Sequence, residues 1–168
     1  MGNIKTEIKW AIIFSLVSLA WMLLEKLSGL HDKYLDYQMY LTLLFFIPAV
    51  WVYVLALKDK REKDFSGSFT YVQGLKSGII LSVFIALLSP LTQWVTTYVI
   101  TPEYFPNVIQ RSVELGYYDS IEAAEQNFNY KNYAIQGMIF AFIAGVLTSL
   151  VVMIFLRNKK EKPVNNTM

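Results

Sequence analysis

The chain has 168 residues, of which 55% are hydrophobic and only 17% charged, and its small net charge of +2 does not imply a nucleic-acid partner. The absence of cysteine excludes disulfides and thiolate nucleophiles, and a single histidine, His31, excludes a histidine-rich metal centre. We therefore expect neither a bound metal nor another cofactor.

Four long uncharged stretches separated by charged segments dominate the sequence. They hold 15 residues between Lys9 and Glu25, 21 between Asp36 and Lys58, 26 between Lys76 and Glu103, and 25 between Lys131 and Arg157. A helix needs about 20 apolar residues to cross the hydrocarbon core of a bilayer. The sequence thus predicts an all-α protein with one membrane domain over residues 1–168, a four-helix transmembrane bundle with spans near 10–30, 39–57, 74–100 and 133–156.

The first span, 10–30, reaches this length only if it carries Glu25 and Lys26 near one end. Glu25 follows Trp21 by four residues and so shares its helical face, and carboxylates within membranes are costly and often functional. Gln93 and Gln136 fall in the corresponding halves of their spans, so they and Glu25 form a candidate ligand or proton site. Alternatively, Glu25 reaches the lipid headgroups or pairs with a lysine at the interface. We expect the first span to be retained rather than cleaved as a signal peptide, because no small-x-small site follows it.

Two prolines interrupt apolar spans. Pro48 lies in the middle of the second span and Pro90 in the second half of the third. Each removes a backbone hydrogen bond to the carbonyl four residues earlier, which predicts a helix kink at both positions. Kinked helices occur in transporters and channels, but prolines are also common in other transmembrane helices, so transport remains one of two alternatives.

Small residues recur every four positions in the third and fourth spans. The third span carries Gly74, Gly78, Ser82 and Ala86, and the fourth carries Gly137, Ala141, Gly145 and Ser149. Spans associate in lipid through close packing of small residues, because lipid tails offer no hydrophobic driving force between helices. The two faces therefore either pack against each other within the chain or form a homo-oligomer interface or a lipid-binding slot.

The segment 101–132 is long enough to fold. A helix could open at Pro106 and Asn107 and end at Gly116, and a second could begin at Asp119 or Ser120, where Glu122 is placed like a capping-box carboxylate. We expect a short helical cap on the external face, the alternative being a solvated loop. The segment 157–168 is a predicted cytoplasmic tail.

The basic residues are distributed unequally between the two sides. Ten lie before the first span, between the second and third, and after the fourth, whereas Lys33, Arg111 and Lys131 lie on the opposite side. Because cytoplasmic loops carry an excess of lysine and arginine, this predicts that both termini are cytoplasmic.

Several segments match a known family. They are Lys9-Trp10, Trp21 to Glu25, Tyr53 to Arg61, Phe69 to Gly78, Leu88 to Leu91 and Thr101 to Phe105. Through them the chain resembles a family of small bacterial four-span membrane proteins described only as a domain of unknown function. The resemblance implies a location in the bacterial cell (inner) membrane and transfers no activity.

No catalytic motif is visible, since the chain lacks a Ser-His-Asp set, an HExxH motif and a glycine-rich phosphate loop. We expect a non-enzymatic, multi-pass membrane module that packs with itself, with membrane lipid or with an envelope complex through its small-residue faces. The alternative is a small transporter, or a lipid- or small-ligand-binding protein, that uses a polar pocket around Glu25.

Overall fold

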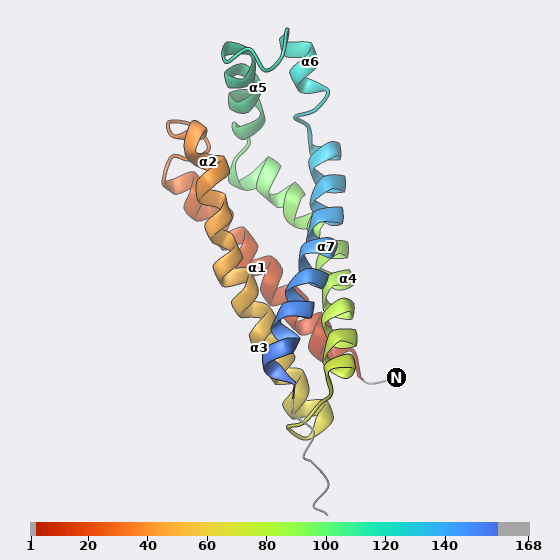
Figure 1. The fold of residues 1–168 in the computed structure, drawn as a ribbon. Helices are drawn as coiled ribbons and strands as arrows, with labels where there is room; N and C mark the ends of the chain where they lie inside the picture. The colour runs from red at the N-terminus through yellow and green to blue at the C-terminus, as the bar shows by residue number, and fades with distance from the viewer. Residues whose placement is uncertain (1–2, 158–168) are drawn as a thin grey trace, which may run out of the picture.

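The computed structural model describes residues 3–157, and in this part of the chain every regular element is a helix (Figure 1). The order is α1 (Lys5–Leu27), α2 (Leu35–Leu41), the 3-10 helix η1 (Thr42–Phe45), α3 (Phe46–Phe65), α4 (Tyr71–Val95), the π-helix η2 (Thr96–Ile100), α5 (Tyr104–Glu114), α6 (Ile121–Glu125) and α7 (Tyr130–Leu156). The predicted all-α class is confirmed.

Four helical stretches are long and apolar enough to cross a membrane. They are α1, the run from α2 through η1 into α3, α4 with η2, and α7, which a turn separates from α6. The predicted tail begins at Arg157. Its remaining residues, 158–168, which include Lys159, Lys160 and Lys162, lie outside the described part. The number of spans agrees with the prediction from the uncharged stretches.

The helices that contain the first two predicted spans begin and end at other residues than the spans themselves. We expected the first to run to residue 30, but α1 ends at Leu27 because Gly29, at φ +81°, turns the backbone into the left-handed region. The amide of Leu30 then donates to the carbonyl of Glu25 at 3.0 Å. The second span was expected at 39–57, yet its helix starts at Leu35 and continues through charged residues to Phe65.

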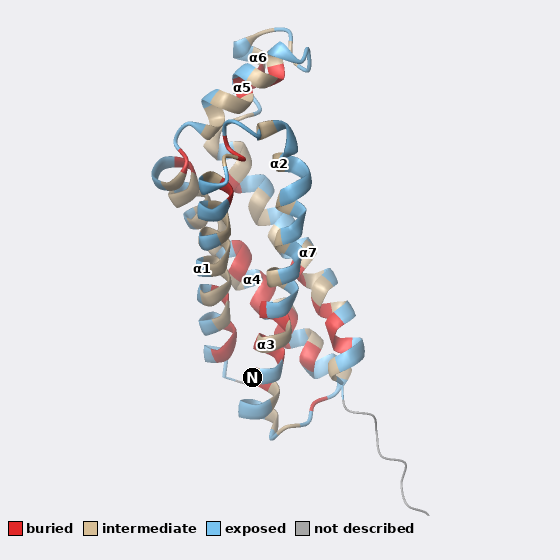
Figure 2. Cartoon of the chain, turned by 90° about the vertical axis from the view of Figure 1, so that its left-hand side faces the viewer, coloured by how far each residue is buried: buried red, intermediate tan, exposed pale blue. Residues whose placement is uncertain are grey.

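The spans pack most closely in the half of the molecule that holds both described chain ends. Figure 1 shows α3 and α7 close together there and diverging toward the α2 end, and Figure 2 shows most buried residues of the spans in the same half. The core of this half is formed by two clusters: Ala11, Tyr53, Ala56, Leu81 and Ile85, and Leu57, Phe69, Val152 and Met153. The opposite half is consequently more open between the helices.

The small-residue faces of α4 and α7 meet within the chain. A Cβ atom added to Gly78 would overlap Ser149, and one added to Gly145 would overlap Tyr53 and Ser82. Gly74 lies equally close to Met153. Gly137 differs, because the nearest atom to its added Cβ would be Ser89 Oγ at 4.0 Å.

These contacts predict unequal effects of adding one methyl group. Gly145→Ala and Gly78→Ala should each lower stability by about 1–3 kcal/mol, because a well-packed interior must shift to accept the new atom. Gly137→Ala, on the same face of α7, should change little. Thermal unfolding in detergent measures the difference, and equal melting temperatures for the three variants would contradict close packing of the two faces.

The two prolines stand at different kinds of irregularity. Pro48 is the third residue of α3, directly after the 3-10 turn of η1. Pro90 lies inside α4, and Figure 1 shows the ribbon of α4 and η2 changing direction in its upper part, away from α7. The Pro90 carbonyl accepts from Tyr130 Oη at 3.2 Å. The upper half of α4 therefore contributes to the opening between the spans.

The segment between α4 and α7 is helical, as expected. The helix predicted from Pro106 begins slightly earlier, as α5 at Tyr104, and Gly116 follows its end at φ +75°. Ser120, rather than Asp119, caps α6, accepting from the amide of Ala123 at 3.2 Å. Arg111 of α5 donates to both carboxylate oxygens of Asp36 at 2.9 and 2.7 Å, which fixes α5 beside α2.

Candidate functional site

Glu25, near the end of α1, is the most deeply buried carboxylate in the described chain, with 2% of its surface exposed. Trp21 Nε1, one turn earlier on the same helix, donates to Glu25 Oε1 at 2.5 Å. The Thr42 hydroxyl of η1 donates to the same oxygen. Oε2 lies 3.1 Å from His31 Nε2. The carboxylate thus has a partner from α1, from η1 and from the loop between α1 and α2.

The left-handed turn at Gly29 returns the chain so that His31 reaches Glu25. His31 is 4% exposed, and Asn107 Nδ2 of α5 donates to its backbone carbonyl at 2.9 Å. The ring of Tyr104 packs edge-on against the imidazole, with the ring centroids 5.2 Å apart. Residues of α5 therefore cover the Glu25–His31 pair.

The position of the carboxylate determines the hydrogen bonding of the imidazole. With Nε2 facing Glu25, a neutral His31 places its proton on Nε2 and leaves Nδ1 as an acceptor. Nδ1 is buried and has no hydrogen-bond partner in the described structure. Burial raises the pKa of the nearby Tyr104 phenol, which stays neutral and donates to Gln38 Oε1 at 3.3 Å.

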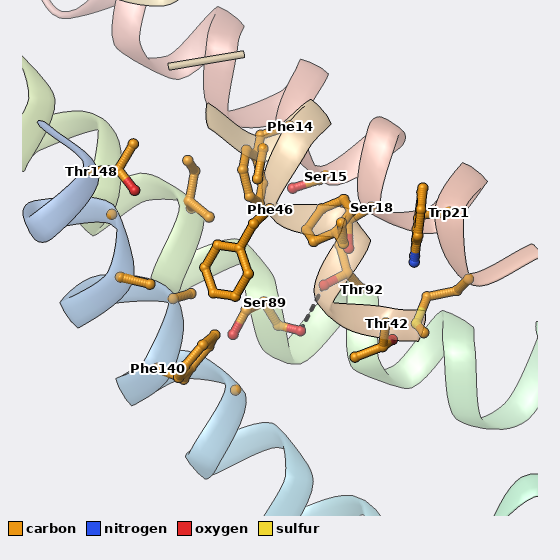
Figure 3. Close-up of a pocket in the computed structure, with 18 of the residues that line it drawn as sticks. Phe14, Ser15, Ser18, Trp21, Thr42, Phe46, Ser89, Thr92, Phe140 and Thr148 are labelled. Atoms are coloured by element: carbon orange, nitrogen blue, oxygen red, sulfur yellow. Dashed lines mark hydrogen bonds between the residues drawn. The ribbon is translucent and has the colours of Figure 1, made fainter. Parts of the chain in front are cut away.

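A cavity of about 310 Å³ adjoins this cluster inside the open half of the bundle (Figure 3). Its walls are Phe14, Ser15, Ser18, Trp21 and Met22 of α1, Thr42, Leu43 and Phe45 of η1, Phe46, Ala49 and Tyr53 of α3, Ile85, Ser89, Thr92 and Gln93 of α4, and Gly137, Phe140, Ala141, Ala144, Gly145 and Thr148 of α7. We call this space the apolar cavity.

The apolar cavity has a polar end and a lateral margin. Trp21 and Thr42, which line one end, are the residues that donate to Glu25, and Figure 3 shows Thr148 at the opposite end. The rings of Phe46 and Phe140 lie where α3 and α7 diverge, with their centroids 6.3 Å apart, and both side chains are exposed. The cavity therefore adjoins the lipid-facing surface between these two helices.

A second, smaller space of about 80 Å³ lies beside the first, and we call it the polar chamber. Met22 and Gln93 line both spaces, so the two spaces adjoin at these side chains. His31, Gln38, Thr97 and Tyr104 are among the residues that line the chamber. The arrangement provides an apolar volume that ends in a hydrogen-bonding region.

Comparison with known protein families finds a match. The family model described as "Protein of unknown function (DUF4199)" matches residues 9–158. The chain belongs to this family. No curated protein and no solved structure matches the chain. Membership in DUF4199 supplies no activity, so the function of this member is argued from its site.

The structure places the three residues of the predicted polar pocket in different surroundings in this DUF4199 member. Glu25 is buried as described above. Gln93 lies between the apolar cavity and the polar chamber, and its amide donates to Thr97 Oγ1 at 3.0 Å rather than to Glu25. Gln136 is exposed on α7 and lines neither space. The alternative in which Glu25 pairs with a lysine does not fit either, since its partners are Trp21, His31 and Thr42.

Sequence reasoning missed His31, Thr42 and Tyr104 as parts of this site. The only histidine of the chain lies six residues after Glu25 with Gly29 between them, a spacing that permits the chain to turn back. That pattern could have pointed to His31. Nothing in the local sequence indicates that Tyr104, far along the chain, packs on the imidazole.

A second buried ionic cluster joins α1, α3 and α4 near the chain ends. Lys60 Nζ lies 3.0 Å from the Glu7 carboxylate, pairs with Asp64, and donates to the Asn3 carbonyl at 2.6 Å. Ser77 Oγ donates to Glu7 at 2.7 Å. Both Glu7 and Lys60 are at most 5% exposed. Because these charged groups already bind one another, we assign the cluster to fold stability rather than to a ligand.

Proposed function

We propose that this chain is a non-enzymatic, multi-pass membrane protein that binds a membrane lipid or another small amphiphile in the apolar cavity. The observation that supports this most directly is a cavity of about 310 Å³ between α1, η1, α3, α4 and α7, with a polar end at Trp21 and Thr42. Ligand sites of this kind are concave, mostly apolar and supplied with a few placed polar groups.

The small-residue faces favour this role over a scaffold that uses them to bind partners. Gly78, Gly145 and Ser149 are engaged in contacts between α4 and α7 of the same chain. A second copy or an envelope protein would have to separate the two helices to reach them. The glycines therefore support internal packing, and the cavity lies beside that packing, with α3 and α7 among its walls.

The position of the ligand site also suggests its route of access. Phe46 and Phe140 are 44% and 61% exposed, on the outer surface where α3 and α7 diverge. A chain from the surrounding bilayer would pass between these rings without crossing water. Binding from the lipid phase thus requires no opening of the α5–α6 segment.

Cavity-filling variants test this function. We expect Ala144→Phe, on the cavity wall, to remove a co-extracted lipid that native mass spectrometry detects on the wild-type protein. Ala20→Phe is the matched control, because Ala20 is exposed on α1 and does not line the cavity. Equal lipid occupancy of the wild type and both variants would argue against the cavity as the binding site.

We further propose that the protein lies in the bacterial cell (inner) membrane with both termini cytoplasmic. The contacts of Lys60 with Asn3 and of Arg61 with the Leu156 carbonyl bring the start of α1, the end of α7 and the α3–α4 turn to one end of the bundle. Among the described residues, the excess of lysine and arginine lies on this side.

The orientation predicts a specific labelling pattern. Since the chain has no cysteine, single cysteines can be introduced without background. A membrane-impermeant maleimide applied to spheroplasts should label Asn107→Cys and Ser120→Cys but leave Ser66→Cys unlabelled until the membrane is permeabilised. Labelling of Ser66→Cys in intact spheroplasts would reverse the proposed topology.

A further inference from the structure

We infer that the amphiphile bound in the apolar cavity carries a hydrogen-bond-donating head without negative charge, a long-chain alcohol or amine. This inference rests on the proposed function and adds the chemical class of the ligand. It follows from three features of the site. They are the charge of the surrounding groups, the hydrogen-bonding groups of the polar chamber, and an apolar lining that binds an alkyl chain no better than the lipid does.

The site provides no positively charged side chain to pair with an anionic head group. Among the described residues, no lysine, arginine, aspartate or glutamate lines the apolar cavity or the polar chamber. The charge behind the polar end is Glu25, paired with His31. That pair has a net charge of −1 with a neutral imidazole and zero with an imidazolium, so it is not positive in either state. A carboxylate or phosphate head would meet no compensating charge there.

The lysine adjacent to Glu25 in the sequence does not face either space. Lys26 follows Glu25 on α1, but its ammonium lies 3.9 Å from Glu103, and it lines neither space. Like charges brought together in a site that excludes water repel each other strongly. The electrostatic environment therefore disfavours fatty acids and phospholipid phosphates at the polar end.

The polar chamber offers acceptors to the head. When the imidazole is neutral and its Nε2–H faces Glu25, His31 Nδ1 is an acceptor, and it is buried and without a partner. Gln93 uses its amide nitrogen on Thr97, which leaves its carbonyl oxygen as an acceptor. Gln38 Oε1 accepts from Tyr104 and has a second lone pair. A hydroxyl or ammonium group supplies the donors that these acceptors lack, whereas an ether or ester head supplies none.

The polar head of the ligand must determine recognition, because the alkyl chain of the ligand gains no free energy by moving from the bilayer into the cavity. Lipid tails are as apolar as the cavity walls, so transfer of an alkyl chain from lipid to cavity has no hydrophobic driving force. An unpaired buried acceptor, in contrast, has a definite free-energy cost that a donor relieves. Heads on the same chain should consequently bind with different affinities.

Fluorescence quenching in uncharged phosphatidylcholine nanodiscs tests this ranking. The probes share a ten-carbon chain with a bromine at its middle and carry an alcohol, an amine, a carboxylate or a methyl ether, at a pH where the carboxylate is ionised. One variant keeps only Trp21, on the cavity wall, and another keeps only Trp51, which is 62% exposed and lies outside the cavity. Quenching of Trp51 reports the concentration of the probe in the lipid. The ratio of Trp21 quenching to Trp51 quenching therefore measures binding in the cavity.

We expect the alcohol and the amine to quench Trp21, relative to Trp51, at concentrations at least about tenfold lower than the carboxylate. The methyl ether should be weaker than the alcohol. Gln93→Leu should reduce the preference of the alcohol over the ether, and it leaves the partners of Glu25 in place. Glu25→Gln should narrow the gap between the amine and the carboxylate.

The outcomes separate the two proposals. Equal quenching of Trp21 by all four heads, in excess of Trp51, would overturn the inferred head chemistry and leave binding in the cavity standing. A preference for the carboxylate would also overturn it. If no probe quenched Trp21 beyond Trp51, the proposed binding function itself would fail. A stronger effect of the amine than of the alcohol would point to the charge of Glu25 as the main determinant, and the reverse to the polar chamber.

Discussion

Replacing Lys60 with methionine should lower the free energy of unfolding by about 3–5 kcal/mol, because it leaves the buried Glu7 carboxylate without its cation. Lys60 is 5% exposed and binds Glu7, Asp64 and the Asn3 carbonyl. Methionine matches the lysine side chain as far as Cε but has no ammonium group to donate hydrogen bonds. Unfolding in mixed detergent and denaturant, followed by circular dichroism, measures the loss.

Two further variants determine whether that loss is electrostatic. Lys63→Met removes a partly exposed lysine whose ammonium lies 3.0 Å from Asp59, and exposed pairs contribute only about 0–1 kcal/mol. Glu7→Gln combined with Lys60→Met removes one of the unpaired charges and should recover part of the stability. A Lys60→Met protein as stable as Lys63→Met would show that the cluster is solvated in the membrane-bound protein.

The second large effect is expected at Glu25. Glu25→Leu removes the acceptor of Trp21, Thr42 and His31 in a buried position. Each unsatisfied buried donor costs about 1–3 kcal/mol, so the combined loss should be about 3 kcal/mol or more. Glu25→Gln keeps one acceptor oxygen for Trp21 and Thr42 and should lose about 1 kcal/mol.

Thermal unfolding of the two Glu25 variants side by side measures this difference. The glutamine variant should melt close to the wild type and the leucine variant well below it. Indistinguishable melting temperatures for leucine and glutamine would mean that the three donors find other partners, and the carboxylate would then not organise the polar end of the cavity.

The number and order of the spans could be predicted because they depend on local composition. A stretch without charge that is long enough to cross the bilayer must be helical, since backbone groups in lipid need internal partners. The ends of the helices were harder to predict. Gly29 ends α1 through a left-handed conformation, and α3 continues to Phe65 because its charged residues bind within the cluster of Glu7 and Lys60.

The site could be predicted only in part because its residues come together through packing. The spacing of Trp21 and Glu25 on one helix is local, and the structure places a hydrogen bond there. The contact of Glu25 with Thr42 depends on how α1 and η1 cross, and the cavity depends on the divergence of α3 from α7. The periodicity of the sequence contains no information on how α1 and η1 cross or on how far α3 diverges from α7. It also could not separate Gln93, which borders the cavity, from Gln136, which is exposed on α7.

Photo-crosslinking in the membrane tests the cavity most directly as the ligand site. A ten-carbon alcohol with a diazirine near its methyl end, irradiated with the reconstituted protein and mapped by peptide mass spectrometry, should label cavity-lining positions such as Ser18, Ala49 and Ala144. An excess of the unmodified alcohol should suppress that labelling, and Ala144→Phe should abolish it. Labelling confined to lipid-facing positions such as Leu87 and Phe155, unaffected by competitor or variant, would contradict the account.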